Sequence, residues 1–289
     1  MTYSIHPNTV LGEVKLRVSD LERSILFYEK VVGLTVLSRS GKHTASFTAK
    51  GGSTPLLILE EIPNAKRVTP RSHAGLYHFA ILLPDRTSLG IALRHLAEAG
   101  IEIGQGDHTV SEALYINDPD GHGIEIYADR PRSTWKKDEH HNYIMGTDPV
   151  DVEGLLQLAG NIPFTGLPAG TIIGHVHFHI SDLEVARHFY NHLLGFDIVV
   201  DASRYMHALF ASAGGYHHHI GLNVWAGKGA PKVPSDAVGI DYFTIIFENQ
   251  TVYEEALTRL EQNGVSVSRK AEEARVMDPF GIQIRITHA

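Results

Sequence analysis

The chain has 289 residues, which is room for two domains of ordinary size, and its 43% hydrophobic and 20% charged residues are typical of a soluble globular protein. The formal net charge of −8 and the lack of a Lys or Arg run argue against a nucleic-acid partner and favour a small or neutral ligand. No apolar run is long enough to span a bilayer and residues 1–10 lack the features of a signal peptide, so we expect a cytoplasmic protein without a membrane partner.

The first part of the chain predicts one βαβββ unit. Residues 14–18 alternate between apolar and polar side chains as a strand does, and an amphipathic helix over about 21–32 ends at Gly33. Short β runs separated by turn residues follow at about 34–39, 44–48 and 56–60. Three later stretches follow the same order of elements.

Internal repeats indicate that this unit occurs four times. Each long segment has a second copy in which the spacing of its motifs is kept. The matching segments are 14–33 with 176–195, 75–100 with 239–264, and 118–121 with 278–281. We therefore expect an α+β fold of four βαβββ modules in two tandem repeats.

A long connector separates the two repeats. We expect a first module pair at 8–128, the connector at 129–171 and a second module pair at 172–289. The connector is rich in Pro, Gly and charge, and it predicts one short helix at 152–159. A connection of this length usually has a function of its own.

A βαβββ unit leaves one face of its small sheet uncovered, so two units must pair to close a core, and a pair curls into a cup. This pattern resembles the vicinal oxygen chelate, or glyoxalase-like, superfamily, which includes extradiol dioxygenases, glyoxalase I and antibiotic-binding proteins. The resemblance covers nearly the whole chain outside the connector. Members of this superfamily readily associate, so a homo-oligomer is among the expectations.

A more specific resemblance lies in residues 106–125. His108 is followed by five residues, an apolar residue and Tyr115, then by Asp-Pro-x-Gly from Asp118 and by Glu125. This order and spacing resemble the extradiol dioxygenase signature, whereas the Asp-Pro-x-Gly and Glu portion alone is shared across the superfamily. The resemblance implies that Glu125 is an iron ligand and that His108 and Tyr115 are catalytic residues that orient the substrate oxygens.

The remaining metal ligands must be histidines or further carboxylates, because the chain has no cysteine. Oxygen activation by Fe²⁺ needs two imidazoles and one carboxylate, with three coordination positions left open. By resemblance, one ligand sits at the start of a module's first strand and the carboxylate sits on a last strand. The repeat alignment gives the first-strand positions as Glu13, His78, His175 and Tyr242, and the last-strand positions as Glu125 and Arg285.

Two ways of pairing the modules remain open. If the first and second modules share a cup, the ligand set is Glu13, His78 and Glu125, whose harder character suits Mn²⁺ or water-rich Fe²⁺. If the second and third share a cup, the set is His78, His175 and Glu125, which suits Fe²⁺. The familiar extradiol pattern takes all three ligands from the second half of the chain, where the fourth module here lacks them. We favour the second pairing, because it also explains the length of the connector, and Glu13 is then a vestigial or rim carboxylate.

A run of histidines precedes the end of the third module. Residues 218–222, which we expect in the last strand of that module, resemble the stretch in which extradiol enzymes place their acid/base histidine, and this implies a catalytic role for His218. Alternation along a strand would turn His217 and His219 to the opposite face, where they would pack or meet solvent. His177 and His179 share a face with His175 but lie farther along their strand.

The resemblance as a whole implies Fe²⁺-dependent cleavage of a catechol-like diol by O₂, next to its hydroxyl groups, to a hydroxymuconic semialdehyde-type product. His218 would deliver a proton and Tyr115 and His108 would orient the substrate. The same fold carries other functions, so two alternatives stay open: a glyoxalase-type metal isomerase, and a small-molecule-binding protein without catalysis. The sequence does not define the substituents on the ring.

Overall fold

The computed structural model describes residues 3–289 and divides into two compact units. Unit 2 contains Arg17–Ala65 and His78–Gly174, and unit 1 contains the remaining described residues. Three strands begin in one unit and end in the other: β1 (Val10–Val18), β5 (Gly75–Leu83) and β9 (Ile172–His179). Within residues 3–289, no helix is both long and apolar enough to cross a membrane.

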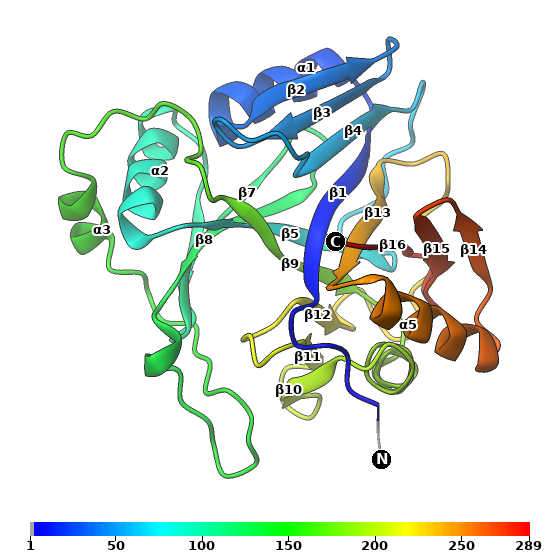
Figure 1. Ribbon diagram of the computed structural model, residues 1–289. Helices are drawn as coiled ribbons and strands as arrows, with labels where there is room; N and C mark the ends of the chain where they lie inside the picture. The colour runs from blue at the N-terminus through cyan, green and yellow to red at the C-terminus, as the bar shows by residue number, and fades with distance from the viewer. Residues whose placement is uncertain (1–2) are drawn as a thin grey trace. The chain divides into compact units, whose positions relative to one another are not determined.

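Unit 2 contains the elements of the first two modules and the connector. Figure 1 shows α1 against the strands that follow it and α3 beside α2. The predicted helix over 21–32 is confirmed as an α-helix that continues into a π-helical turn, and the predicted limits of β3 and α3 match the structure. The elements are α1 (Leu21–Phe27), the turn Tyr28–Val32, β2 (Thr35–Ser40), β3 (Thr44–Thr48), β4 (Leu57–Glu61), α2 (Arg86–Glu98), β6 (Gly104–Asp107), β7 (Ser111–Asn117), β8 (Gly123–Asp129), η2 (Arg132–Thr134) and α3 (Val152–Ala159).

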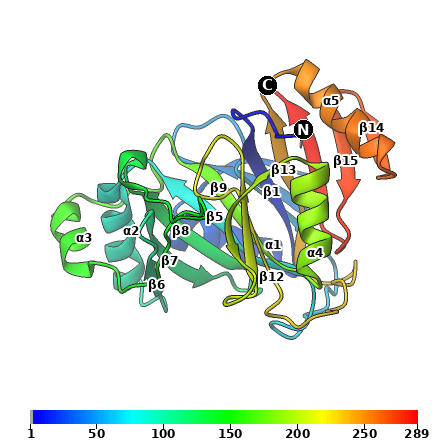
Figure 2. The ribbon, with the colours of Figure 1, turned by 90° about the horizontal axis from the view of Figure 1, so that it is seen from below.

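Unit 1 contains the elements of the third and fourth modules. Figure 2 shows α5 lying along β14 and β15. The π-helical turn that follows α1 has a counterpart after α4, so the repeat extends to an irregular feature of the helix. The elements are α4 (Leu183–Ala186), the turn Arg187–Leu193, β10 (Asp197–Ala202), β11 (Ala208–Ser212), β12 (Ile220–Asn223), β13 (Gly239–Phe247), α5 (Gln250–Gln262), β14 (Val267–Lys270), β15 (Glu273–Met277) and β16 (Gln283–His288).

The strand order pairs the second module with the third. One sheet runs β10-β11-β12-β9-β5-β8-β7-β6, and the other runs β14-β15-β16-β13-β1-β4-β3-β2. Within each unit, residues of β5 and residues of β9 contact one another. In unit 1 the rings of Tyr77 and His177 are 5.2 Å apart, and in unit 2 a Cβ atom at Gly174 would lie 3.0 Å from Cβ of Leu82. The favoured pairing is confirmed, and so is the α+β fold of four βαβββ modules.

A buried tyrosine–aspartate hydrogen bond joins two modules in each unit. The Tyr28 hydroxyl donates to Oδ2 of Asp118 at 3.0 Å in unit 2, and the Tyr190 hydroxyl donates to Oδ2 of Asp278 at 2.9 Å in unit 1. Both tyrosines belong to the π-helical turns, and both aspartates open the Asp-Pro-x-Gly turn before a last strand. Burial of the phenol, together with the charge of the neighbouring aspartate and the hydrogen bond to it, raises the pKa of each tyrosine well above its ordinary value.

The two aspartates differ in their charge because their neighbours differ. Burial opposes the ionised form of Asp118, but its charge interaction with His122, whose Nδ1 is 2.7 Å away, and its hydrogen bonds from His122 and Tyr28 together outweigh burial and lower the pKa. The equivalent neighbour of Asp278 is Ile282, and there burial raises the pKa to about 6 despite hydrogen bonds from backbone N–H groups and Tyr190. In the second repeat, the Asp-Pro-x-Gly turn therefore begins with a carboxyl group, that of Asp278, whose ionisation is unfavourable.

This difference predicts a pH dependence of stability. Because the folded-state pKa of Asp278 is raised from 3.8 to about 6, its contribution to stability is complete below about pH 4 and is lost as the pH rises through about 6. The loss is on the order of 3 kcal/mol. We expect Asp278→Asn to flatten the fall in unfolding free energy over this window, as measured by urea unfolding at a series of pH values.

Asp118→Asn is the matched control. The pKa of Asp118 is lowered, so its contribution is present near neutral pH and is lost as the pH falls. That variant should lose stability near neutral pH and keep the fall between about pH 4 and 6. An Asp278→Asn protein with the full wild-type fall would show that another group causes it.

Candidate metal centre

Two of the predicted ligands lie on neighbouring parallel strands of unit 2. β5 and β8 pair with His78 opposite Gly123 and Ala80 opposite Glu125, so alternation places the side chains of His78 and Glu125 on the same face. Nε2 of His78 lies 3.0 Å from Oε2 of Glu125, and the residues are 5% and 2% exposed. A buried carboxylate requires a positive or hydrogen-bonding partner, and here the partner is an imidazole.

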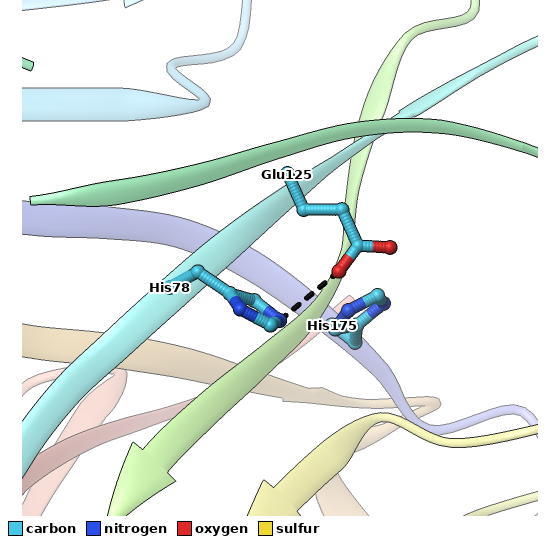
Figure 3. Close-up of side chains that lie close together, drawn as sticks. All are labelled: His78, Glu125 and His175. Carbon is cyan, nitrogen blue, oxygen red and sulfur yellow. Dashed lines mark ion pairs between the residues drawn. The ribbon is translucent and has the colours of Figure 1, made fainter. Parts of the chain in front are cut away.

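The third predicted ligand, His175, follows directly after Gly174, the last residue of unit 2, on β9. Figure 3 shows its ring beside the carboxylate of Glu125 and the ring of His78. One ligand atom from each of the three lies within 4.8 Å of the others, and all three residues are buried. Two imidazoles and one carboxylate are the donor set typical of a non-haem Fe²⁺ centre. These residues could hold such an ion.

His108 and Tyr115 form a hydrogen-bonded pair in unit 2. Tyr115 pairs with Glu125 across β7 and β8, so its ring lies on the same face of the sheet, with its centroid 5.7 Å from that of His78. Nε2 of His108 and the Tyr115 hydroxyl are 2.6 Å apart, while Nδ1 of His108 is 2.8 Å from the carbonyl oxygen of Gly146. The structure therefore brings both predicted residues to the face that carries Glu125.

His218 does not lie in a strand as expected, because β12 begins only at Ile220. The preceding glycines, Gly214 and Gly215, have φ of 59° and 64° and turn the chain ahead of the histidine run. In this irregular backbone Nδ1 of His217 lies 2.7 Å from Nδ1 of His218, so the predicted opposite facing of these two is wrong.

His218 nevertheless lies beside a predicted ligand within unit 1. Its ring centroid is 4.1 Å from that of His175, and His217, His218 and His219 are all buried. His219 accepts a hydrogen bond from the Ala213 N–H at 3.2 Å through Nδ1, so it packs against its own turn. The His217 ring is farther away, with its centroid 6.1 Å from that of His175.

The equivalent positions of the other sheet, in unit 1, contain an ion pair. Nη1 of Arg285 lies 2.6 Å from Oε1 of Glu13, and the Tyr242 hydroxyl is 3.4 Å from the same oxygen. Nε of Arg285 also contacts Glu273 at 2.5 Å. Glu13 is 7% exposed, so it does not lie on a rim: it is a buried partner of a guanidinium, and the alternative expectation of a vestigial ligand position stays a prediction. Among the described residues, the set of His78, Glu125 and His175 is the group found with metal-ligand geometry.

Two polar contacts of the site region were not predicted from the sequence. Asn223 donates through Nδ2 to Nε2 of His177 at 2.9 Å and accepts from Nδ1 of His179 at 2.7 Å, so it links two of the three histidines of β9. The carbonyl of Gly146 contacts His108 from within the connector. A backbone carbonyl leaves no mark in a sequence, and the length of the connector was the one available signal.

Similarity to known proteins agrees with this geometry. The model of the glyoxalase/bleomycin resistance protein/dioxygenase superfamily matches residues 10–126 and 172–286. A catechol-2,3-dioxygenase of Bacillus subtilis (strain 168) is 54% identical over 276 residues, which is 96% of either chain. A metapyrocatechase of Geobacillus stearothermophilus is 29% identical over 120 residues, 40% of this chain and 34% of its own.

The solved structure of glyoxalase I from Zea mays shares the fold, with a TM-score of 0.54 at 16% identity, and the match covers 97% of this chain and 92% of that one. The two segments matched by the superfamily model lie on either side of the connector and contain all four modules. This chain therefore belongs to the glyoxalase/bleomycin resistance protein/dioxygenase superfamily.

Proposed function

We propose that the protein is an Fe²⁺-dependent extradiol dioxygenase that uses O₂ to cleave a catechol-like diol next to its hydroxyl groups, with a hydroxymuconic semialdehyde-type product. The observation that carries the proposal is the identity of 54% over 96% of both chains with a protein named catechol-2,3-dioxygenase. The donor set of two imidazoles and one carboxylate supports it, because this set leaves coordination positions for a diol and O₂. We also propose that the protein works in the cytoplasm.

His78, His175 and Glu125 would hold the ion. Bound Fe²⁺ would supply a Lewis acid for the diol oxygens and a redox partner for O₂. We favour Fe²⁺ over Mn²⁺ because the ligand set with two histidines is softer than the set that includes Glu13. Glu13 instead forms an ion pair with Arg285. Burial of the three ligands keeps the dielectric constant around them low and strengthens their interaction with an ion.

Tyr115 and His108 would orient a hydroxyl group of the diol. Tyr115 shares a face of the sheet with Glu125, so its hydroxyl can reach a substrate held at that carboxylate. His108 supports the phenol from the other side through a 2.6 Å contact. Holding one reactant in a fixed orientation lowers the entropic part of the barrier.

His218 would deliver a proton during bond cleavage. Its ring lies beside His175 without belonging to the ligand set, which is the placement that a general acid needs. The Nδ1 contact with His217 requires that one of these two nitrogens carries a hydrogen, so the pair can pass a proton between them.

The ligand assignment predicts the metal content of single variants. His78→Ala, His175→Ala and Glu125→Ala should each lose bound iron and oxygen consumption with catechol, because two remaining ligands give neither the affinity nor the geometry of the site. Glu13→Gln is the matched control and should keep its iron. Elemental analysis after anaerobic loading with Fe²⁺ measures the result, and iron loss in Glu13→Gln with retention in His175→Ala would reverse the assignment.

The choice of metal predicts a dependence on redox state. Peroxide should inactivate the loaded protein, and Fe²⁺ with ascorbate under anaerobic conditions should restore it, since the reaction needs the ferrous ion. Protein loaded with Zn²⁺ alone should consume no oxygen, because zinc has no redox chemistry. Oxygen-electrode traces with catechol compare the forms, and full activity with Zn²⁺ would rule out the dioxygenase proposal.

The role of His218 predicts a loss of chemistry without a loss of metal. His218→Phe should keep wild-type iron content while kcat and kcat/KM fall together by roughly 10²–10⁴, as for removal of a general acid. His188→Phe, a change at an exposed histidine of the same unit, is the control. An iron-free His218→Phe protein would make His218 a ligand, and normal turnover would place the acid elsewhere.

A further inference from the structure

The connector forms an isolated antiparallel β-bridge with β6 in unit 2. Asp107 and Asp148 exchange backbone hydrogen bonds of 2.8 and 3.0 Å, as an antiparallel pair does. Next to this pair, the Gly146 N–H donates to the His108 carbonyl at 3.3 Å. The Gly146 carbonyl in turn lies 2.8 Å from Nδ1 of His108. Gly146 therefore contacts His108 through both its backbone groups.

Two side chains bind the connector just after this β-bridge. Oε1 of Gln105, on β6, accepts from the N–H of Val150 at 2.5 Å. Arg86 contacts Glu112 of β7 at 2.5 Å and Asp151 at 3.1 Å, and so joins the connector to the strand that carries Tyr115. Glu112 is 1% exposed, so this ion pair reaches into the core. Contacts with residues of β6 and β7 thus anchor the part of the connector that contains Gly146.

The carbonyl decides which nitrogen of His108 carries hydrogen. A carbonyl oxygen only accepts, so Nδ1 of His108 must be the donor in the 2.8 Å contact. In the neutral ring Nε2 is then an acceptor, and the Tyr115 hydroxyl, 2.6 Å away, must donate to it. With its hydrogen directed to His108, the Tyr115 oxygen presents lone pairs and can accept a hydrogen bond from a hydroxyl group.

We infer that Gly146 is a positioning residue: its carbonyl sets the tautomer of His108 and so makes the Tyr115 oxygen an acceptor for a free hydroxyl of the substrate. The inference rests on the proposed diol substrate. It adds that the hydroxyl group oriented by Tyr115 is protonated when the diol binds. Gly146 lies outside the segments matched by the superfamily model, so this support comes from the part of the chain between the repeats.

Two variants loosen the contact by different routes. Gly146→Ala adds a Cβ atom that would meet Oγ1 of Thr109 at 3.1 Å and Oδ2 of Asp148 at 3.3 Å, so it crowds the two residues next to the Gly146 contact with His108. Gln105→Leu removes the acceptor for the Val150 N–H without touching His108. Gln157→Leu, the same change at an exposed position of α3, is the matched control.

The first readout is the tautomer of His108, measured by long-range ¹H–¹⁵N NMR on metal-free, ¹⁵N-histidine-labelled protein. The His108 signals are assigned by their loss in His108→Gln. Wild type and Gln157→Leu should show hydrogen on Nδ1, and the two loosened variants should show both tautomers. Hydrogen on Nε2 in wild type would overturn the inference, whether or not the protein cleaves catechol.

The second readout is kcat/KM for catechol with iron content measured on the same samples. Gly146→Ala and Gln105→Leu should lose roughly 10- to 100-fold with wild-type iron, as expected for a misplaced orienting group. Unchanged kcat/KM in variants with mixed tautomers, or an equal loss in Gln157→Leu, would overturn the inference. A wild-type protein that retains iron, shows the Nδ1 tautomer and cleaves no catechol would instead contradict the proposed function alone.

Discussion

The buried carboxylate of Asp118 is the interaction on which the site depends. Its Oδ1 accepts the N–H groups of Asp120 and His122, each at 2.9 Å, and its Oδ2 contacts Tyr28 and the His122 ring. A carboxylate with this many donors can remain ionised away from water. It closes the turn from which β8 starts, and since a shift by one residue would turn every side chain of the strand over, it keeps Glu125 on the face of His78.

The repeats show how one scaffold can carry different chemistry. Three backbone positions correspond between the two sheets: those of His78, His175 and Glu125 in one match those of Tyr242, Glu13 and Arg285 in the other. In the first set three donors can surround a cation, whereas in the second the protein supplies the cation as a guanidinium. The ion pair satisfies a buried carboxylate that would otherwise be costly.

The sequence was sufficient to predict the modules and the three residues that cluster at the proposed metal site, because both depend on local patterns. Alternation, helix periodicity and the repeat define the strands and helices. The repeat alignment also identifies His78, His175 and Glu125 as the residues at the proposed ligand positions. The histidine run at 217–219 was misjudged, since a turn with two glycines of positive φ breaks the strand alternation there. The contact between Gly146 and His108 involves a backbone carbonyl, and no residue type specifies such a partner.

The ion pair of Glu13 and Arg285 has a consequence for the protein when metal ions are scarce. Because this half of the repeat holds its own permanent positive charge, its buried carboxylate is neutralised as soon as the chain folds. That carboxylate then needs no metal ion to neutralise it, whereas the cluster of His78, Glu125 and His175 is the proposed site for an ion. With the proposed iron site, iron starvation would therefore leave folded protein that regains its activity when iron is supplied, without new synthesis.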